Sequence, residues 1–310
     1  MNRRDFLLAA AAAAASAKAA PSRKLNVSVF SKHLQFLQGE DLAKAVAEIG
    51  FDGIDLSVRA GGHVEPERVA QDLPPLLKII RAHHLEVPMI TSGIEDADTP
   101  HAESVLRTIS ELGIHHYRWG GFKYDPAGPA FSQQLDALKP RVAKLAALNA
   151  KYQTGAMFHT HSGINLVGAP IWDLYILLKD FDPRAVGVNY DIGHATVEGG
   201  FGGWIDSFRV LGPHLRGVAV KDFLWEKDAR GNWRAEWKPI GEGMVRFPQF
   251  FQLLAKSDFN GPLQVHFEYP LGGADSGKRS ITIPKEQVLS AMKTDLEKVR
   301  SYLTKVGLSG

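Results

Sequence analysis

Short apolar runs of strand type alternate with longer segments of helical periodicity along almost the whole chain. The strand-like runs span residues 25–30, 53–58, 86–90, 115–119, 154–158, 186–191, 215–220 and 263–267. Helical periodicity covers residues 41–49, 73–84, 102–112, 131–150, 171–178, 247–256 and 285–303. Strands that alternate with helices predict a parallel sheet, and eight repeats predict a closed barrel, a fold that usually needs about 250 residues. The expected fold class is therefore α/β, a single (β/α)8 barrel.

An open, doubly wound sheet is the competing topology. Such a sheet usually carries a glycine-rich nucleotide-binding turn directly after its first strand. Here that turn, residues 30–35, reads FSKHLQ and contains no glycine. The closed barrel is the better fit.

One connection, the segment after the seventh strand from Asp222 to Arg246, is much longer than the others. Its residues 228–232 read DARGN, a sequence typical of a hairpin turn, and three tryptophans flank them at positions 225, 233 and 237. Loops that follow barrel strands lie at the end where active sites form. The hairpin is expected to be a lid over that mouth, or else a surface decoration with stacked tryptophans.

The first residues have the pattern of an export signal. Arg3 and Arg4 precede an apolar, alanine-rich run that ends in the small-residue site Ala17-Lys18-Ala19. Paired arginines, an apolar run and such a site predict a twin-arginine signal peptide over residues 1–19, with the barrel domain at 20–310. The run is shorter than the roughly 20 apolar residues that span a bilayer, so no stable membrane insertion is expected after cleavage. The predicted location is periplasmic or secreted; a retained anchor is the alternative.

Charge and cysteine content narrow the choice of partners. The chain has 36 basic and 34 acidic residues; removing the leader takes away Arg3, Arg4 and Lys18 against Asp5, which leaves 33 of each. Without a basic field, no nucleic-acid partner is expected. The chain has no cysteine, which excludes disulfides and thiolate metal sites. Homo-oligomerisation is left open.

Several strands end in charged or imidazole side chains on the face that alternation directs into the barrel. The clearest example is the strand at 186–191, which ends in Asp191 and is followed by a glycine and His194. Buried charges must be paired or bound, so their gathering at one mouth predicts an active site. The full set is Arg59, Arg118, His159, His161, Asp191, His194, Lys221 and Glu268.

Other polar residues on these strands are expected to be structural. Asp55 would form a buried ion pair with Arg59, a structural alternative to the mouth role of that arginine, and His266 would be a hydrogen-bonded core residue below the mouth. Four further histidines lie on helical or turn segments and are expected at the surface: His83, His84, His101 and His214.

Six motifs together resemble the xylose isomerase-like TIM-barrel superfamily, the sugar phosphate isomerase/epimerase group. They are GFDGIDL at 50–56, HTHSG at 159–163, DIGH at 191–194, VKD at 220–222, GEG at 241–243 with Phe247, and HFEY at 266–269. In that family the sixth-strand Asp and the eighth-strand Glu bind a divalent metal, together with a fifth-strand Glu and a seventh-strand His. The resemblance implies Asp191 and Glu268 as metal ligands and His194 as a substrate contact.

Two positions depart from the family pattern. His159 stands where the fifth-strand Glu is usual, and Ala219 stands where the seventh-strand His is usual. The expected ligand set is therefore Asp191, Glu268 and His159, with His161 or His194 as a source of a further ligand. A mixed set of nitrogen and oxygen ligands would suit Zn²⁺ or Co²⁺ as well as Mn²⁺ or Mg²⁺. Alternatively the metal is lost and Lys221 supplies the positive charge.

The activity that the resemblance implies is sugar isomerisation or epimerisation, in which a base removes a proton next to a carbonyl and a cation stabilises the enediolate. Glu268 is the expected base, with His159 as the partner acid and Lys221 beside it. Substrate contacts are expected from Arg59, His63, Arg118, His161 and His194. Export favours a free sugar, keto-sugar or glycoside over a sugar phosphate. The alternatives are a non-catalytic periplasmic sugar-binding barrel, and a lyase or dehydratase on keto-sugars or inositol-type substrates.

Overall fold

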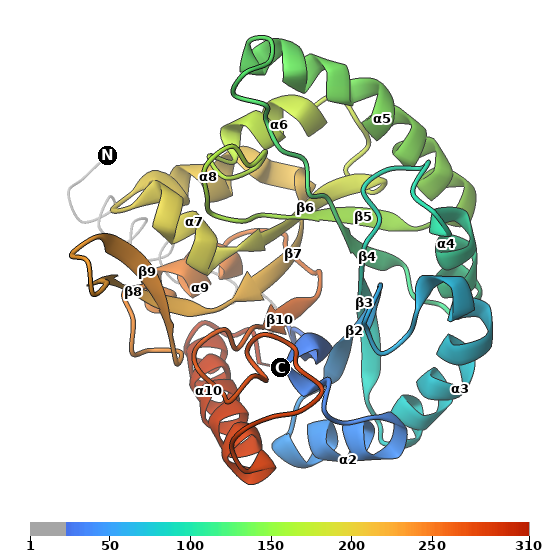
Figure 1. The fold of residues 1–310 in the computed structure, drawn as a ribbon, viewed down its shortest axis with the longest axis vertical. Helices are drawn as coiled ribbons and strands as arrows, with labels where there is room; N and C mark the ends of the chain where they lie inside the picture. The colour runs from blue at the N-terminus through green and yellow to red at the C-terminus, as the bar shows by residue number, and fades with distance from the viewer. Residues whose placement is uncertain (1–22, 310) are drawn as a thin grey trace, which may run out of the picture.

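The computed structural model describes residues 23–309, which form a closed parallel barrel of eight strands. The strands follow one another around the barrel in the order β1-β10-β7-β6-β5-β4-β3-β2. Strand β1 pairs with both β10 and β2, which closes the barrel. Helices ring the barrel on the outside (Figure 1). The barrel strands are β1 (Val27–Phe30), β2 (Gly53–Val58), β3 (Glu86–Ser92), β4 (His116–Trp119), β5 (Gly155–His159), β6 (Val186–Asp191), β7 (Leu215–Val220) and β10 (Leu263–Val265).

In residues 23–309, seven α-helices overlap the expected helical segments, and two more, α7 (Ile192–Gly199) and α8 (Gly203–Leu211), lie where no helix was expected. The seven are α2 (Gly39–Ile49), α3 (Val69–Ala82), α4 (Ala102–Glu111), α5 (Phe131–Tyr152), α6 (Trp172–Leu178), α9 (Phe247–Ala255) and α10 (Lys285–Lys305). Short 3₁₀ turns lie at Ser31–Leu34, Pro66–Arg68 and Gly212–His214. Within the described residues, no helix combines the length and apolarity that a membrane crossing needs. The expected signal peptide at 1–19 lies outside the described residues.

The alternation of side chains along each strand separates the two faces of the barrel wall. On β2, Ile54 and Leu56 are fully buried in the core that also contains Leu42 and Val46 of α2. The alternating positions of the strands are polar and equally buried, for example Ser57 on β2. Apolar side chains therefore pack between the barrel and the helices, and polar side chains face the barrel interior and its mouth.

The insertion after β7 is a two-stranded antiparallel hairpin, as expected, built from β8 (Asp222–Lys227) and β9 (Trp233–Lys238). Asp228 closes its turn by accepting from the backbone N–H groups of Arg230 and Asn232. At the base of the hairpin, the Asp222 carboxylate accepts from the backbone N–H groups of Gly241, Gly243 and Val245. This carboxylate thereby ties the returning chain to the end of β7. The hairpin projects from the edge of the barrel (Figure 1).

Candidate active site

Asp191 lies where β6 becomes helix α7, and its two oxygens have different tasks. Oδ1 accepts from the backbone N–H of His194 at 3.0 Å and caps α7, a helix that the sequence patterns did not indicate. Oδ2 has no hydrogen-bond donor in the part of the chain that the structure describes, and it points toward the other side chains of the mouth. Because the residue is fully buried, the pKa of Asp191 is raised to about 6, although nearby Lys221 opposes this shift.

Lys221 is the central cation of the site. It follows β7, its side chain is 2% exposed, and its Nζ lies 2.8 Å from Glu268 Oε2 and 3.4 Å from Asp191 Oδ2. Nζ also donates to His194 Nε2 at 2.7 Å and lies 4.0 Å from the centre of the Trp237 ring. The hairpin therefore does contribute to the mouth, through Trp237, while Trp225 and Trp233 are partly exposed.

Glu268 follows β10 and bridges two lysines. Its Oε2 accepts from Lys221, and its Oε1 lies 3.4 Å from Lys32 Nζ, a residue that the sequence patterns did not single out. These two ammonium groups hold the pKa of Glu268 well below its ordinary value despite burial, so the carboxylate is ionised at neutral pH. With a side chain that is 22% exposed, Glu268 borders a cavity of about 380 Å³ that is also lined by Trp237 and Glu236. Solvent and small molecules can reach this carboxylate.

Both ring nitrogens of His194 are taken up by protein groups. Nε2 accepts from Lys221, so the proton of the neutral ring is on Nδ1, which donates to Ser162 Oγ at 2.8 Å. Burial and the neighbouring ammonium of Lys221 hold the pKa of His194 well below its ordinary value. Its direct contact is with Lys221, which it orients toward Glu268; the substrate contact expected from the sequence stays a prediction.

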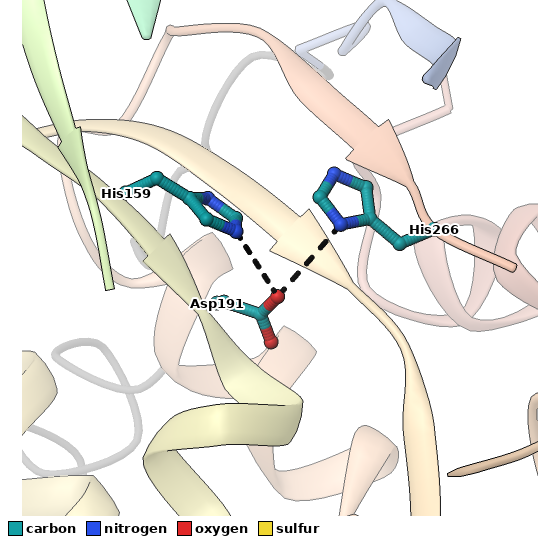
Figure 2. A group of neighbouring side chains, drawn as sticks. All are labelled: His159, Asp191 and His266. Atoms are coloured by element: carbon teal, nitrogen blue, oxygen red, sulfur yellow. Dashed lines mark ion pairs between the residues drawn. The ribbon is translucent and has the colours of Figure 1, made fainter. Parts of the chain in front are cut away.

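Three buried residues bring possible ligand atoms together: His159, Asp191 and His266, with ligand atoms within 4.8 Å of one another. His159 Nε2 lies 3.6 Å and His266 Nδ1 3.9 Å from Asp191 Oδ2, so the two imidazoles face the same oxygen from β5 and from the chain after β10 (Figure 2). By distance alone, this group could hold a metal ion. Glu268 is not part of it, whereas the sequence placed Glu268 among the ligands.

His266 corrects one expectation. The expectation was a hydrogen-bonded core residue, but within residues 23–309 neither ring nitrogen of this buried histidine has a hydrogen-bond partner. Buried polar atoms without protein partners are uncommon and are explained by an ordered water, a bound ion or a role in function. The alternation of Gln264, His266 and Glu268 already directed His266 into the barrel interior, and that signal could have placed it in the site.

A hydrogen-bond relay decides which ring nitrogen of His159 carries the proton. The carbonyl of Pro262 can only accept, so Gln264 Nε2 donates to it at 3.1 Å and Gln264 Oε1 faces Asn189. Asn189 Nδ2 then donates both to Gln264 Oε1 at 2.8 Å and to His159 Nδ1 at 3.1 Å. His159 Nδ1 is therefore an acceptor, and in the neutral ring the proton is on Nε2, the atom that faces Asp191. A metal ligand needs a lone pair there, so His159 does not fit the expected divalent metal.

Two arginines lie beside this group over the Phe30 ring. The Arg59 and Arg118 guanidinium carbons are 5.5 and 6.0 Å from its centre. Arg118 Nη2 donates to His161 Nε2 at 3.2 Å, and His161 Nδ1 in turn donates to the His159 carbonyl at 3.1 Å. Burial and the neighbouring Arg59 lower the pKa of Arg118 to about 10. The structure thus brings His161 and both arginines to the mouth.

The prediction of a buried ion pair between Asp55 and Arg59 was wrong. Among residues 23–309, Asp55 has no ion-pair partner and instead accepts from Thr91 Oγ1 at 2.9 Å. Burial raises the pKa of Asp55 to about 7, and the two arginines only oppose this from a distance. Neither guanidinium is therefore neutralised by a direct carboxylate contact within that span.

Two other histidines, His63 and His214, do not lie where the sequence patterns predicted. His63 Nε2 donates to the Leu37 carbonyl at 3.2 Å. This contact lies outside the group formed by Lys221, His194 and Glu268, so the structure does not bring His63 to that group. His214 was expected at the surface, but it is buried and its Nε2 donates to the Phe181 carbonyl at 3.3 Å.

Comparisons with known proteins agree with this architecture. An inosose dehydratase from Bacillus velezensis is 24% identical over 253 residues, which are 74% of this chain and 81% of that protein. D-psicose 3-epimerase from Clostridium cellulolyticum superposes with a TM-score of 0.65 at 13% identity, over 90% of this chain and 99% of that chain. The 3-keto-D-glucoside 4-epimerase from E. coli superposes with a TM-score of 0.61 at 14% identity, over 90% and 100% of the two chains. At these identities, the solved structures show a shared fold alone.

The family itself is established by sequence. A profile described as xylose isomerase-like TIM barrel matches residues 43–289, which is most of the chain and includes every strand from β2 to β10. Three of the motifs that resembled this group, DIGH, VKD and HFEY, contribute Asp191, Lys221 and Glu268 to the cluster described above. The chain belongs to the xylose isomerase-like TIM barrel family.

Proposed function

We propose that the protein is an enzyme that removes a proton from a carbon next to a carbonyl group of a carbohydrate, as a sugar isomerase or epimerase. The observation that carries this proposal is the contact between the ionised Glu268 carboxylate and the Lys221 ammonium, 2.8 Å apart beside a cavity. An enediolate requires both partners at once: a base for the C–H proton and a cation for the charge that develops on the carbonyl oxygen.

Glu268 is the proposed base. It is the carboxylate of the cluster that a substrate can reach, whereas Asp191 is fully buried. Its low pKa keeps it unprotonated and ready to accept, and a substrate that enters between Glu268 and the lysines would weaken the ion pairs and raise that pKa. Lys221 Nζ then remains as the donor to the substrate oxygen, held in place by His194 and Asp191.

His159 is the proposed partner of Lys221 at the substrate oxygen. Burial holds its pKa well below the ordinary value, so the ring is neutral, and its Nε2–H is the available donor. A neutral imidazole can stabilise an enediolate by hydrogen bonding without changing its charge, as in triosephosphate isomerase. An epimerase also needs a proton delivered to the opposite face of the carbon. His159 Nε2–H is the proposed donor, and its ring would regain a proton from solvent while Glu268 releases the one it accepted.

Arg59 and Arg118 are proposed to hold substrate oxygens. Each presents a guanidinium at the mouth without a direct carboxylate partner in residues 23–309, and guanidinium groups bind hydroxyl, carboxylate or phosphate oxygens in defined geometry. We infer from the leader that the protein is exported, which favours a free sugar, keto-sugar or glycoside as the substrate class.

Dehydration is the second candidate function. It is favoured by the 24% identical relative, which is an inosose dehydratase. The first step would be the same proton transfer to Glu268. The enediolate would then expel the hydroxyl group on the next carbon, which takes the proton back from Glu268 and leaves as water. The two reactions are separated by their products, an isomeric sugar or an unsaturated ketone.

Solvent deuterium exchange tests the shared step. The protein is incubated in D₂O with a panel of ketoses, 3-keto-glycosides and inosose, and deuterium next to the carbonyl is measured by NMR. Wild-type protein should incorporate deuterium into at least one of them, and Glu268→Gln should lower that rate by about 10²-fold or more. Glu236→Gln, which changes another carboxylate of the same cavity, is the matched control and should retain the rate. Equal incorporation by wild type and Glu268→Gln would reject Glu268 as the base.

A further inference from the structure

We propose that this centre has replaced the divalent metal of its family with protein groups: the Lys221 ammonium takes the place of the cation, and His159 presents a proton instead of a ligand lone pair. The catalytic use of this arrangement rests on the proposed function above, but the arrangement itself does not. Three features of the described residues carry it.

The first feature is that the two carboxylates expected as metal ligands already hold a cation. Lys221 Nζ lies 2.8 Å from Glu268 and 3.4 Å from Asp191, so it occupies the space between them. A divalent ion bound by the same two carboxylates would be brought against this ammonium, and the like charges would repel. The position from which the family supplies a histidine is Ala219, which has no ligand atom.

The second feature is the direction of the hydrogen bond to His159. A histidine that binds a metal almost always donates its second ring N–H to a carboxylate, a carbonyl or water. Here the second nitrogen, Nδ1, accepts from Asn189 Nδ2, which also donates to Gln264 Oε1. Turning over the Asn189 amide would place its oxygen against Gln264 Oε1, and turning over both amides would place Gln264 Oε1 against the Pro262 carbonyl. The Nε2 that faces Asp191 therefore carries a proton.

The third feature is the packing that holds Lys221 in this position. A Cβ atom at Gly193 would lie 2.7 Å from Lys221 Cγ and 2.9 Å from the Lys221 carbonyl oxygen. The glycine of the DIGH motif thus leaves the space through which the lysine side chain passes. On the other side, the Trp237 ring covers Nζ at 4.0 Å. Gly193 thus makes room for the lysine stem, and Trp237 covers the ammonium at its end.

In the reaction, these groups supply the charge balance without any further component. The C–H proton passes to Glu268, the electron pair moves to the carbonyl oxygen, and that oxygen is stabilised by hydrogen bonds from Lys221 Nζ and His159 Nε2. The proton returns from Glu268 to the same face, or His159 Nε2–H protonates the opposite face and the ring regains a proton from solvent while Glu268 releases its own. No oxidant or co-reactant is consumed.

Metal binding is measured by elemental analysis of the purified protein and by calorimetric titration with Mn²⁺ and Zn²⁺. Wild-type protein and the control Lys238→Met, whose lysine pairs with Glu226 on the hairpin, should contain and bind less than one equivalent. Lys221→Met should expose Asp191 and Glu268 and bind Zn²⁺. Adding Asn189→Asp, which turns the donor to His159 Nδ1 into an acceptor, should tighten that binding by about 10–100-fold. Stoichiometric metal in the wild type, or no gain in the double variant, would overturn the proposal.

A second readout concerns the histidine protons directly. In protein labelled with ¹⁵N-histidine, NMR should show the Nε2–H form for His159 and the Nδ1–H form for His194, and neither signal should move when Zn²⁺ is added. Shifts of the His159 signal on adding Zn²⁺ would refute the proposal, as would an Nδ1–H form of that ring. These measurements need no substrate. If the protein is free of metal and has the stated ring forms but exchanges no deuterium, the proposed function is refuted and the proposal of this section still stands.

Discussion

Replacement of Lys221 by methionine should destabilise the protein strongly at pH 8. The variant keeps the length of the side chain but leaves Asp191, which is fully buried, and Glu268 without their shared ammonium. Removing one partner of a buried ion pair costs about 3–5 kcal/mol; because Glu268 is 22% exposed, we expect the lower end of that range. For a domain of this size, such a loss lowers Tm by roughly 6–10 °C.

The same variant should lose less stability at pH 5 than at pH 8. Burial alone raises the pKa of Asp191, and Lys221 limits the rise to about 6. Without the lysine, the pKa rises further, so the folded variant keeps Asp191 protonated over a wider pH range than wild type does. A carboxyl group whose folded pKa exceeds its unfolded value stabilises the fold at low pH, and this contribution is lost as the pH rises through the folded pKa. The destabilisation is therefore largest at high pH.

Thermal denaturation followed by circular dichroism at both pH values measures this effect. Lys238→Met is the control, because its ion pair with Glu226 is partly exposed and should contribute about 1 kcal/mol or less. A loss of Tm for Lys221→Met that is no larger than the control, or that is equal at pH 5 and pH 8, would refute the assignment of Lys221 as the buried counter-ion.

Three further predictions concern the surroundings of this cluster. Asp55→Asn should gain stability over wild type as the pH rises from 4 to 8, by up to about 4 kcal/mol, because the pKa of this buried carboxyl is raised to about 7; a difference in Tm that does not change with pH would contradict it. Arg118→Gln should raise KM by about 10-fold or more in the deuterium-exchange assay, since it removes a charged donor to substrate oxygen; an unchanged KM would place the substrate elsewhere. Trp237→Ala should lower kcat by about 10-fold through loss of the ring that covers Lys221, and a rate equal to that of Trp233→Ala, an exposed tryptophan of the same hairpin, would assign Trp237 a packing role alone.

The fold and the place of the site were predictable because their signals are local. The bounds of β2, β6 and β7 follow from short apolar runs, and the alternation along each strand separates the residues that face the helices from those that face the mouth. Parallel strands in a closed barrel bring their carboxyl ends to one rim, so Asp191, Lys221 and Glu268 had to come near one another. The hairpin after β7 was equally readable from its turn residues. Helix α7 was not, because Ile192–Gly199 is short and begins directly at the end of β6.

What these neighbours do to one another was decided by tertiary structure alone. Whether Lys221 pairs with Glu268, 47 residues away, depends on side-chain rotamers and on the space left at Gly193. Neither can be inferred from the periodicity of the sequence. The proton on His159 is placed by a relay that starts at the Pro262 carbonyl, more than 100 residues further along the chain. The residues of a site follow from periodicity, but their charge and protonation follow from contacts between distant segments, and those contacts exist only once the barrel has closed.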